Sequence, residues 1–171
     1  MIEEKAEMIE ERADDADDLY EREEKREETI QLVVFRLARE WYGVDIRKVK
    51  EIVKVNRVTY LPSSPEHIAG IVSLRGNILS VTDLKVLLNV SPELPAEKAR
   101  IIAVESGSME TGLIADEVIG SIELPVRVIG PAIPTIPDKG AKYLDGLCKV
   151  DNKLIGILSV EKVLEVQDNG T

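Results

Sequence analysis

The sequence is poor in the residues that build disulfides, metal centres and nucleophilic active sites. One of its 171 residues is cysteine, Cys148, and one is histidine, His67. A single cysteine excludes an intramolecular disulfide and is typical of a reducing compartment, and no second histidine or cysteine is present to complete a tetrahedral zinc site. Phosphate-binding loops and G-x-S-x-G elbows are absent as well. We therefore expect a binding protein without catalysis, cofactor or metal, in which His67 is a solvated surface residue and Cys148 an inert strand residue.

Long apolar runs and clustered positive charge are also missing. No stretch approaches the roughly 18 apolar residues of a membrane span, and the first residues lack the pattern of a secretory signal. The protein is therefore predicted to be cytoplasmic and soluble, without insertion into a membrane. The formal charge of -10 is concentrated in residues 1–30, which hold 14 Asp/Glu and 5 Lys/Arg, so the remainder is nearly neutral. This balance argues against nucleic acid, which is bound through clustered Lys and Arg.

Residues 1–29 form an acidic segment without glycine or proline. It is rich in Glu, Arg, Ala and Lys, which are good helix formers, so a charged N-terminal helix is predicted. Weakly apolar residues recur at alternating spacings of three and four, which places them on one helix face: Ile2, Ala6, Ile9, Ala13, Ala16 and Tyr20. Two interpretations remain open. The helix docks on a partner or on a second copy through this stripe, or it is a solvated extension, since its alanines bury little area.

The rest of the chain, residues 30–166, is predicted to be mainly β. The clearest pattern is G-I-V-S-L-R-G-N-I-L-S-V-T-D from Gly70 to Asp83, in which two apolar runs flank Arg75-Gly76-Asn77. A short loop with Gly and Asn between β-rich runs indicates a hairpin. Further strands are expected at residues 30–37, 41–46, 100–104, 112–115, 118–124, 144–150 and 154–158. Short helices are expected near residues 49–53, 65–68, 83–88 and 160–166.

The chain also matches itself. The nineteen residues that begin at Gly70 align without a gap with the nineteen that begin at Gly146, which indicates an internal duplication. Short antiparallel strands with tight connections bury one face by closing into a small barrel. Two small β-barrels with short connecting helices, packed together along an aliphatic seam, are therefore predicted. The expected bounds are about 30–95 and about 96–166, with exchange of strands between the barrels allowed, and a flexible tail at 167–171.

Arg75 at the hairpin tip distinguishes the two copies. The equivalent turn of the second copy is Asp151-Asn152-Lys153, so the turn itself does not require an arginine. An exposed turn residue is one interpretation. The other is that Arg75 makes a bidentate contact with a carboxylate or with backbone carbonyls, and so holds two segments, or a partner, together.

Several motifs together resemble one family. They are Y-G-V-D-I-R-K-V-K-E-I at Tyr42–Ile52, L-P-S-S-P-E-H-I-A-G-I-V-S-L-R-G-N-I-L-S-V-T-D-L at Leu61–Leu84, G-L-I-A-D-E-V at Gly112–Val118 and Y-L-D-G-L at Tyr143–Leu147. These stretches are similar to the CheW family of chemotaxis coupling proteins. The resemblance implies two SH3-like barrels and a non-catalytic adaptor that joins the cytoplasmic tips of chemoreceptors to the regulatory domain of the histidine kinase CheA. Recruitment to membrane-associated receptor arrays is implied in the same way.

The resemblance also implies roles for five residues. Val49 and Glu51 lie where the family contacts its partners. Arg75, Gly70 and Gly146 match positions that the family needs for receptor coupling or for the shape of a groove between the barrels. We therefore expect Val49, Glu51 and Arg75 to bind partners and the two glycines to shape the groove. Two alternatives are a CheW-like scaffold of a non-chemotactic receptor–kinase pathway and a barrel that binds a small ligand or nucleic acid.

Overall fold

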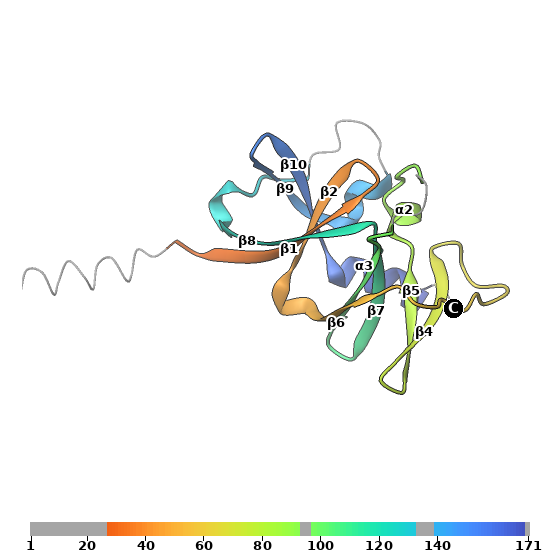
Figure 1. The fold of residues 1–171 in the computed structure, drawn as a ribbon. Helices are drawn as coiled ribbons and strands as arrows, with labels where there is room; N and C mark the ends of the chain where they lie inside the picture. The colour runs from red at the N-terminus through yellow and green to blue at the C-terminus, as the bar shows by residue number, and fades with distance from the viewer. Residues whose placement is uncertain (1–26, 93–96, 133–138, 170–171) are drawn as a thin grey trace, which may run out of the picture.

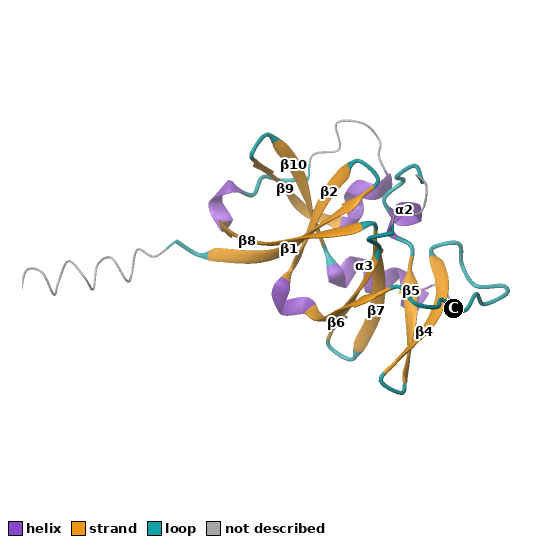
Figure 2. Ribbon diagram, viewed as in Figure 1, coloured by secondary structure: helices purple, strands orange, loops and turns teal. Residues whose placement is uncertain are grey.

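The computed structural model describes residues 27–92, 97–132 and 139–169. Most of the predicted N-terminal helix, residues 1–26, lies outside these ranges, as do residues 170–171 of the predicted tail. Within them, strands dominate and short helices connect them (Figures 1 and 2). The mainly β fold predicted from the sequence is therefore confirmed.

The strands of the described residues form two five-stranded sheets. What we call the terminal barrel has the order β8 (Glu117–Pro125), β1 (Thr29–Leu37), β2 (Glu40–Asp45), β10 (Lys153–Leu158) and β9 (Leu144–Val150). The central barrel has the order β3 (Val49–Lys54), β6 (Arg100–Ser106), β7 (Met109–Ala115), β5 (Asn77–Thr82) and β4 (Ile68–Leu74). Helices connect the strands: η1 (Ile46–Lys48), α2 (Leu84–Leu87), η2 (Val126–Val128), η3 (Lys139–Tyr143) and α3 (Val160–Asn169).

The two barrels do not follow the predicted division at about residue 95. The central barrel uses strands between residues 49 and 115, and the terminal barrel uses strands on either side of that range. β3 leaves the β1–β2 hairpin through η1 and pairs with β6, whereas β8 follows β7 and pairs with β1. Each copy of the repeat therefore gives its first hairpin to one barrel and its later strands to the other. The apolar pattern of a strand specifies which face is buried but not which copy supplies the pairing strand.

The internal duplication is visible in the pairing of the strands. Val81 of β5 pairs in parallel with Gly112 of β7, and Ile157 of β10 pairs in parallel with Gly43 of β2. Register shifts occur at corresponding places, in β3 opposite β6, in β8 opposite β1, and in both edge hairpins, β4–β5 and β9–β10. The predicted duplication is therefore confirmed, with strands exchanged between the copies.

A large apolar cluster joins the barrels. It combines buried residues of β1, β2, β6 and β7 with residues of α2 and α3, and includes Phe35 and Leu164, which are at most 2% exposed. Each barrel also has a smaller interior of its own, which contains Ile155 in the terminal barrel and Ile101 in the central barrel. The predicted aliphatic seam is therefore present, and α3 lies beside it (Figure 1).

Three local predictions were wrong. Residues 49–53, predicted as helical, belong to β3, and the helical turn η1 precedes them. Residues 65–68 form no helix and instead lead into β4. The flexible tail was predicted to begin too early, because α3 continues to Asn169 and the Gln167 side chain donates a hydrogen bond of 2.8 Å to Thr111 Oγ1.

Both edge hairpins end in turns of two residues rather than three. Arg75 and Gly76 have φ of +50° and +82°, and Asp151 and Asn152 have φ of +49° and +64°. Two successive positive φ values define a type I′ turn, whose twist matches that of the flanking strands. Asn77 already belongs to β5. Arginine is unfavourable in the left-handed region, whereas Asp and Asn tolerate it. The backbone conformation of the turn therefore does not explain why residue 75 is an arginine.

Candidate partner-binding surface

Glu51 and Arg75, both predicted to bind partners, meet at one edge of the central barrel. Glu51 lies in β3, and Arg75 lies in the turn between β4 and β5. β3 and β4 are the outer strands of this sheet, and its curvature brings the turn back to β3. Nη2 of Arg75 lies 3.3 Å from Oε2 of Glu51. The ion pair spans the gap between β3 and the β4–β5 hairpin, which we call the central mouth.

The Arg75 side chain is mostly in solvent. It is 85% exposed, whereas the Glu51 side chain is 28% exposed. Exposed ion pairs contribute at most about 1 kcal/mol to stability, because water and salt screen them. A guanidinium has five N–H donors in a planar fork, so Arg75 can bind Glu51 and a further acceptor together. The pair therefore orients Arg75 more than it stabilises the barrel.

A β-bulge in β3 shapes this mouth. Val49 pairs with Val104 and Glu51 pairs with Ala103, so Lys50 is the additional residue. A bulge bends its strand and changes the direction of its side chains. Lys50 and Glu51 consequently line the same small hollow, of about 50 Å³. Val49 is half-buried and packs against the cluster that joins the barrels.

Lys50 forms ion pairs of its own beside this hollow. Its Nζ lies 2.8 Å from Oε2 of Glu110 and 3.6 Å from Oε2 of Glu105, both in the β6–β7 hairpin. The hydrogen bond to Glu110 is the main cause that raises the pKa of Lys50. Sequence analysis missed these three residues, because the bulge that groups them has no signature in the sequence.

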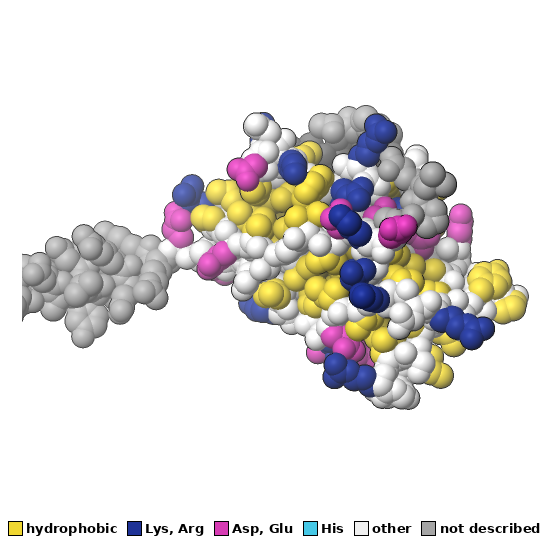
Figure 3. All heavy atoms as spheres, in the orientation of Figure 1, with side chains coloured by type: hydrophobic (Ala, Val, Ile, Leu, Met, Phe, Trp, Pro, Cys, Tyr) yellow, Lys and Arg dark blue, Asp and Glu magenta, His cyan; other side chains and the backbone are white. Residues whose placement is uncertain are grey.

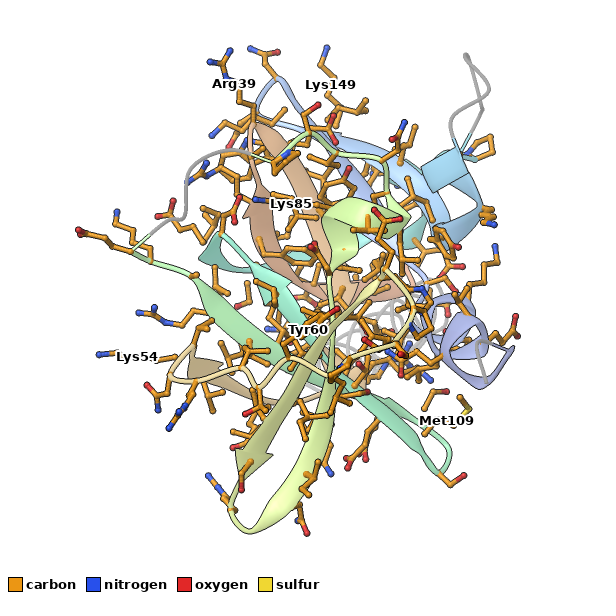
Figure 4. The ribbon with its side chains drawn as sticks, turned by 90° about the vertical axis from the view of Figure 1, so that its right-hand side faces the viewer. Arg39, Lys54, Tyr60, Lys85, Met109 and Lys149 are labelled. Carbon is orange, nitrogen blue, oxygen red and sulfur yellow. The ribbon has the colours of Figure 1, made fainter. Side chains whose placement is uncertain are left out.

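Apolar side chains accompany the charges on the central barrel. Ile52 of β3 is 40% exposed and Ile78 of β5 is 72% exposed. The loop between β3 and β4 adds Tyr60, which is 70% exposed and stands out in Figure 4. Figure 3 shows this loop as the hydrophobic projection at the right of the molecule. β3 pairs only with β6 in its sheet, so its other backbone edge is open to a partner strand.

The close contacts of Gly70 and Gly146 lie within their own barrels, and their predicted role in shaping a groove between the barrels stays a prediction. A Cβ at Gly70 would stand 2.8 Å from the carbonyl carbon of Thr59 and closer still to its oxygen. A Cβ at Gly146 would stand 2.6 Å from the carbonyl oxygen of Gly130. Thr59 and Gly130 each form a backbone bridge to the residue that follows the glycine. Both glycines therefore let a neighbouring segment close on an edge strand.

The terminal barrel has a corresponding gap between β8 and the β9–β10 hairpin, which we call the terminal mouth. Gly120 of β8 has the register position that Glu51 has in β3. Asp151 is the first turn residue of the β9–β10 hairpin, as Arg75 is of the β4–β5 hairpin. Because Gly120 has no side chain, a matching ion pair cannot form. A hollow of about 260 Å³ lies there instead, with Trp41 in its lining. An ion pair spans the central mouth, whereas the terminal mouth has an apolar hollow and no such pair.

His67 and Cys148, the two residues weighed for enzyme chemistry, lie in different barrels. His67 precedes β4 of the central barrel, and Cys148 lies in β9 of the terminal barrel. His67 is half-buried rather than solvated as predicted; its Nε2 has no hydrogen-bond partner among the described residues, and burial lowers its pKa. Burial raises the pKa of the Cys148 thiol, which disfavours the reactive thiolate. Within residues 27–92, 97–132 and 139–169, His, Cys, Asp and Glu form no group suited to a metal ion.

The sequence matches a known family over most of its length. A family model described as a CheW-like domain aligns with residues 31–168. The chain belongs to the CheW-like family. The crystal structure of the scaffolding protein TtCheW from Thermoanaerobacter tengcongensis is similar, with a TM-score of 0.73 and 36% sequence identity, and the match covers 80% of this chain and 88% of that one. The expected pair of SH3-like barrels is therefore confirmed.

Curated CheW relatives align over nearly the same region. The chemotaxis protein CheW of Klebsiella aerogenes is 29% identical over 138 residues, which cover 81% of this chain and 83% of the relative. CheW of Helicobacter pylori is 27% identical over 157 residues, or 86% and 94% of the two chains. Protein FrzA of Myxococcus xanthus is 30% identical over 133 residues, or 77% and 82%. In the described part of the chain, no helix has the length and apolar character to cross a membrane.

Proposed function

We propose that this CheW-like protein is a non-catalytic adaptor of chemotaxis signalling that couples chemoreceptors to the histidine kinase CheA. Curated relatives named as chemotaxis proteins, and a similar structure named as a scaffolding protein, support this function. The structural observation that carries it is the ion pair of Glu51 and Arg75 at the central mouth. Two residues expected to bind partners lie in separate segments, yet together they form one exposed surface.

The central mouth is suited to a protein partner. It offers the open edge of β3 and a guanidinium that is oriented but still in solvent, and the same barrel carries exposed Ile52 and Ile78. Interfaces combine an apolar centre with a polar rim in this way, and arginine is frequent among the residues that dominate their affinity. We propose that β3, with Val49 and Glu51, binds the regulatory domain of CheA, and that Arg75 completes this surface. The cytoplasmic tip of a receptor is the second partner, so the protein acts in the cytoplasm at receptor arrays.

Calorimetric titration of the protein with a CheA regulatory domain, with a receptor tip and with both together tests the proposal. We expect each to bind and the mixture to form a ternary complex. Arg75→Ala should weaken binding of a partner about tenfold or more, since a central arginine contributes on this scale. Arg47→Ala is the matched control, because Arg47 is 80% exposed and pairs with Asp45 away from the mouth. Absence of binding to both partners would overturn the proposal.

A charge exchange distinguishes the two roles of Arg75. The single variants Arg75→Glu and Glu51→Arg each place like charges together, so both should bind less tightly. If Arg75 only braces β3, the double variant rebuilds the pair and recovers binding. If Arg75 contacts the partner itself, the double variant stays weak although its melting temperature is that of the original protein. We expect the second result, because the guanidinium is mostly in solvent.

A further inference from the structure

The terminal mouth is an apolar hollow on the surface of the protein. Its apolar lining consists of Val34, Trp41, Ile119, Ile122, Val150 and Ile155. Ile119 is 45% exposed. Figure 3 shows hydrophobic side chains gathered in the region where Figure 1 places β8 and the β9–β10 hairpin. An exposed apolar hollow that contains a tryptophan has the composition of a binding site.

Basic side chains lie beside this hollow. Nζ of Lys153 lies 3.8 Å from the centre of the Trp41 ring. On the other side of these two residues a second hollow, of about 520 Å³, is lined in part by Arg39 and by Leu154, which is 61% exposed. Lys149 pairs with Leu154 across the β9–β10 hairpin, and Figure 4 shows Arg39 and Lys149 projecting from the same end of the molecule.

Acidic groups also line the two hollows. Asp151 lines the first hollow and Glu40 lines the second, where Glu40 accepts a hydrogen bond from the Tyr42 hydroxyl. Two bases, Arg39 and Lys153, and two acids, Glu40 and Asp151, therefore line the pair of hollows. A ligand with a narrow apolar stripe flanked by charged side chains is complementary to an apolar hollow with such a rim.

We propose that residues 1–26 of the same chain dock in the terminal mouth. This segment has twelve acidic and five basic residues, and its weakly apolar stripe runs from Ile2 to Tyr20. The described chain begins at the correct place: the Glu28 carbonyl accepts a 2.9 Å hydrogen bond from the Val126 amide, and Glu27 forms an ion pair with Arg127. Both contacts are made with η2, which directly follows β8, and β8 lines the mouth.

The distances allow this docking. Thr29 and Val34 are separated by five residues of β1, or about 17 Å. A helix of 26 residues is about 39 Å long, and Ala16 would lie about 16 Å along it from Glu27. A helix folded back over β1 and β8 thus brings Ala16 level with the hollow. The small side chain of alanine lets a helix backbone approach the flat ring of Trp41 closely.

The docking goes beyond coupling of receptors to a kinase and does not depend on it. The internal repeat gives the protein two mouths of the same backbone geometry. When the segment covers the terminal mouth, a partner can bind only at the central mouth. The acidic extension would then determine which end of the protein faces the partner.

Trp41 is the only tryptophan of the chain, so acrylamide quenching of its fluorescence in the full-length protein reports directly on the mouth. Ala16→Glu adds a carboxylate to the stripe and keeps a good helix former. We expect the ratio of docked to undocked protein to fall about tenfold, because the larger side chain keeps the segment away from the Trp41 ring and its carboxylate loses water on burial. The quenching constant should rise accordingly. Met8→Glu, which lies off the stripe, is the matched control and should leave quenching unchanged.

A second pair of variants tests the mouth itself. Ile119→Asp should raise quenching as Ala16→Glu does, whereas Ile52→Asp, at a similarly exposed isoleucine of the central barrel, should not. Circular dichroism confirms that each variant is folded. The proposal is overturned if Ala16→Glu and Met8→Glu give the same quenching constant. It is also overturned if protection of Trp41 increases with protein concentration, because the segment would then come from a second copy.

Discussion

Two glycines with the same unusual backbone provide a direct test of how the central barrel closes. Gly70 and Gly120 have φ of +152° and +154°. Alanine at either position therefore suffers a similar conformational strain, of about 1–3 kcal/mol. The space around them differs. A Cβ at Gly70 would stand 2.9 Å from Cγ1 of Val58 and 2.8 Å from the carbonyl carbon of Thr59, whereas a Cβ at Gly120 would meet nothing within 4 Å.

The difference between the two substitutions isolates the closure of the barrel. Thr59 and Ile71 exchange two backbone hydrogen bonds, of 2.8 and 2.9 Å, across the position that a Cβ at Gly70 would enter. Loss of such bonds costs about 1 kcal/mol each, and crowding against packed atoms costs about 1–3 kcal/mol. Gly70→Ala should therefore lower the free energy of unfolding by about 3 kcal/mol more than Gly120→Ala does. Typical domains have only 5–15 kcal/mol in total, so this loss is large.

Urea unfolding followed by circular dichroism measures the difference. We expect the midpoint of Gly70→Ala to lie well below that of Gly120→Ala, with the same dependence of free energy on urea in both. Equal losses would refute the reasoning, because strain alone would then account for both variants. A Cβ at Gly146 is crowded too, but the φ of Gly146 is not positive, so alanine adds no backbone strain there. The free energy of unfolding of Gly146→Ala should therefore fall by about the cost of crowding alone.

Three further predictions concern the fold as a whole and its two isolated reactive groups. Because each copy of the repeat supplies strands to both barrels, Trp41 fluorescence and circular dichroism should show one coincident thermal transition; two separate transitions would contradict the interlocked pairing. Burial lowers the pKa of His67, so the unfolded state binds more protons near its usual pKa of about 6.5, and stability should fall as the pH decreases from 7.5 through that value. His67→Asn should weaken this pH dependence, and an unchanged slope would assign it to other groups. Cys148 is 3% exposed, so a thiol reagent should modify it at the rate of unfolding in the native protein and rapidly in guanidinium; fast native modification would contradict its burial.

The sequence was informative wherever the determining interaction is local. Alternation of apolar residues located the strands, and two residues with positive φ explain the tight turns that Gly76 and Asn152 indicated. Asp83 was expected to begin a helix, and its side chain accepts a hydrogen bond of 3.1 Å from the Lys85 amide at the start of α2. A capping residue and its target are two positions apart, so this geometry can be predicted without knowledge of the fold.

Features that depend on distant contacts could not be predicted in this way. The choice of β3 to pair with β6 brings together residues of different copies, and the bulge at Lys50 arises only in that pairing. Asp116 is another example. Its buried carboxylate accepts a 2.7 Å hydrogen bond from the Ala38 amide and lies 2.9 Å from Nζ of Lys85. It links the β1–β2 turn to α2, and no local pattern in the sequence marks it.

The candidate site shows the same limit. The family resemblance selected Glu51 and Arg75 separately, through motifs in different parts of the chain. It did not indicate that they touch, because their contact depends on the curvature that brings the β4–β5 turn to β3. The resemblance also assigned Gly70 and Gly146 to a groove between the barrels, whereas their contacts lie with Thr59 and Gly130 inside each barrel.

The magnitudes argue against stability as the reason for Arg75. The pair with Glu51 is exposed and contributes at most about 1 kcal/mol. An L-residue other than glycine in the left-handed region costs about 1–2 kcal/mol, and Arg75 has a φ of +50°. The two contributions cancel or leave a net cost, and the terminal barrel forms the same turn with Asp151 and no such pair. Stability therefore does not account for Arg75, and the proposed contact of its exposed guanidinium with a partner is the role that the variants of Arg75 test.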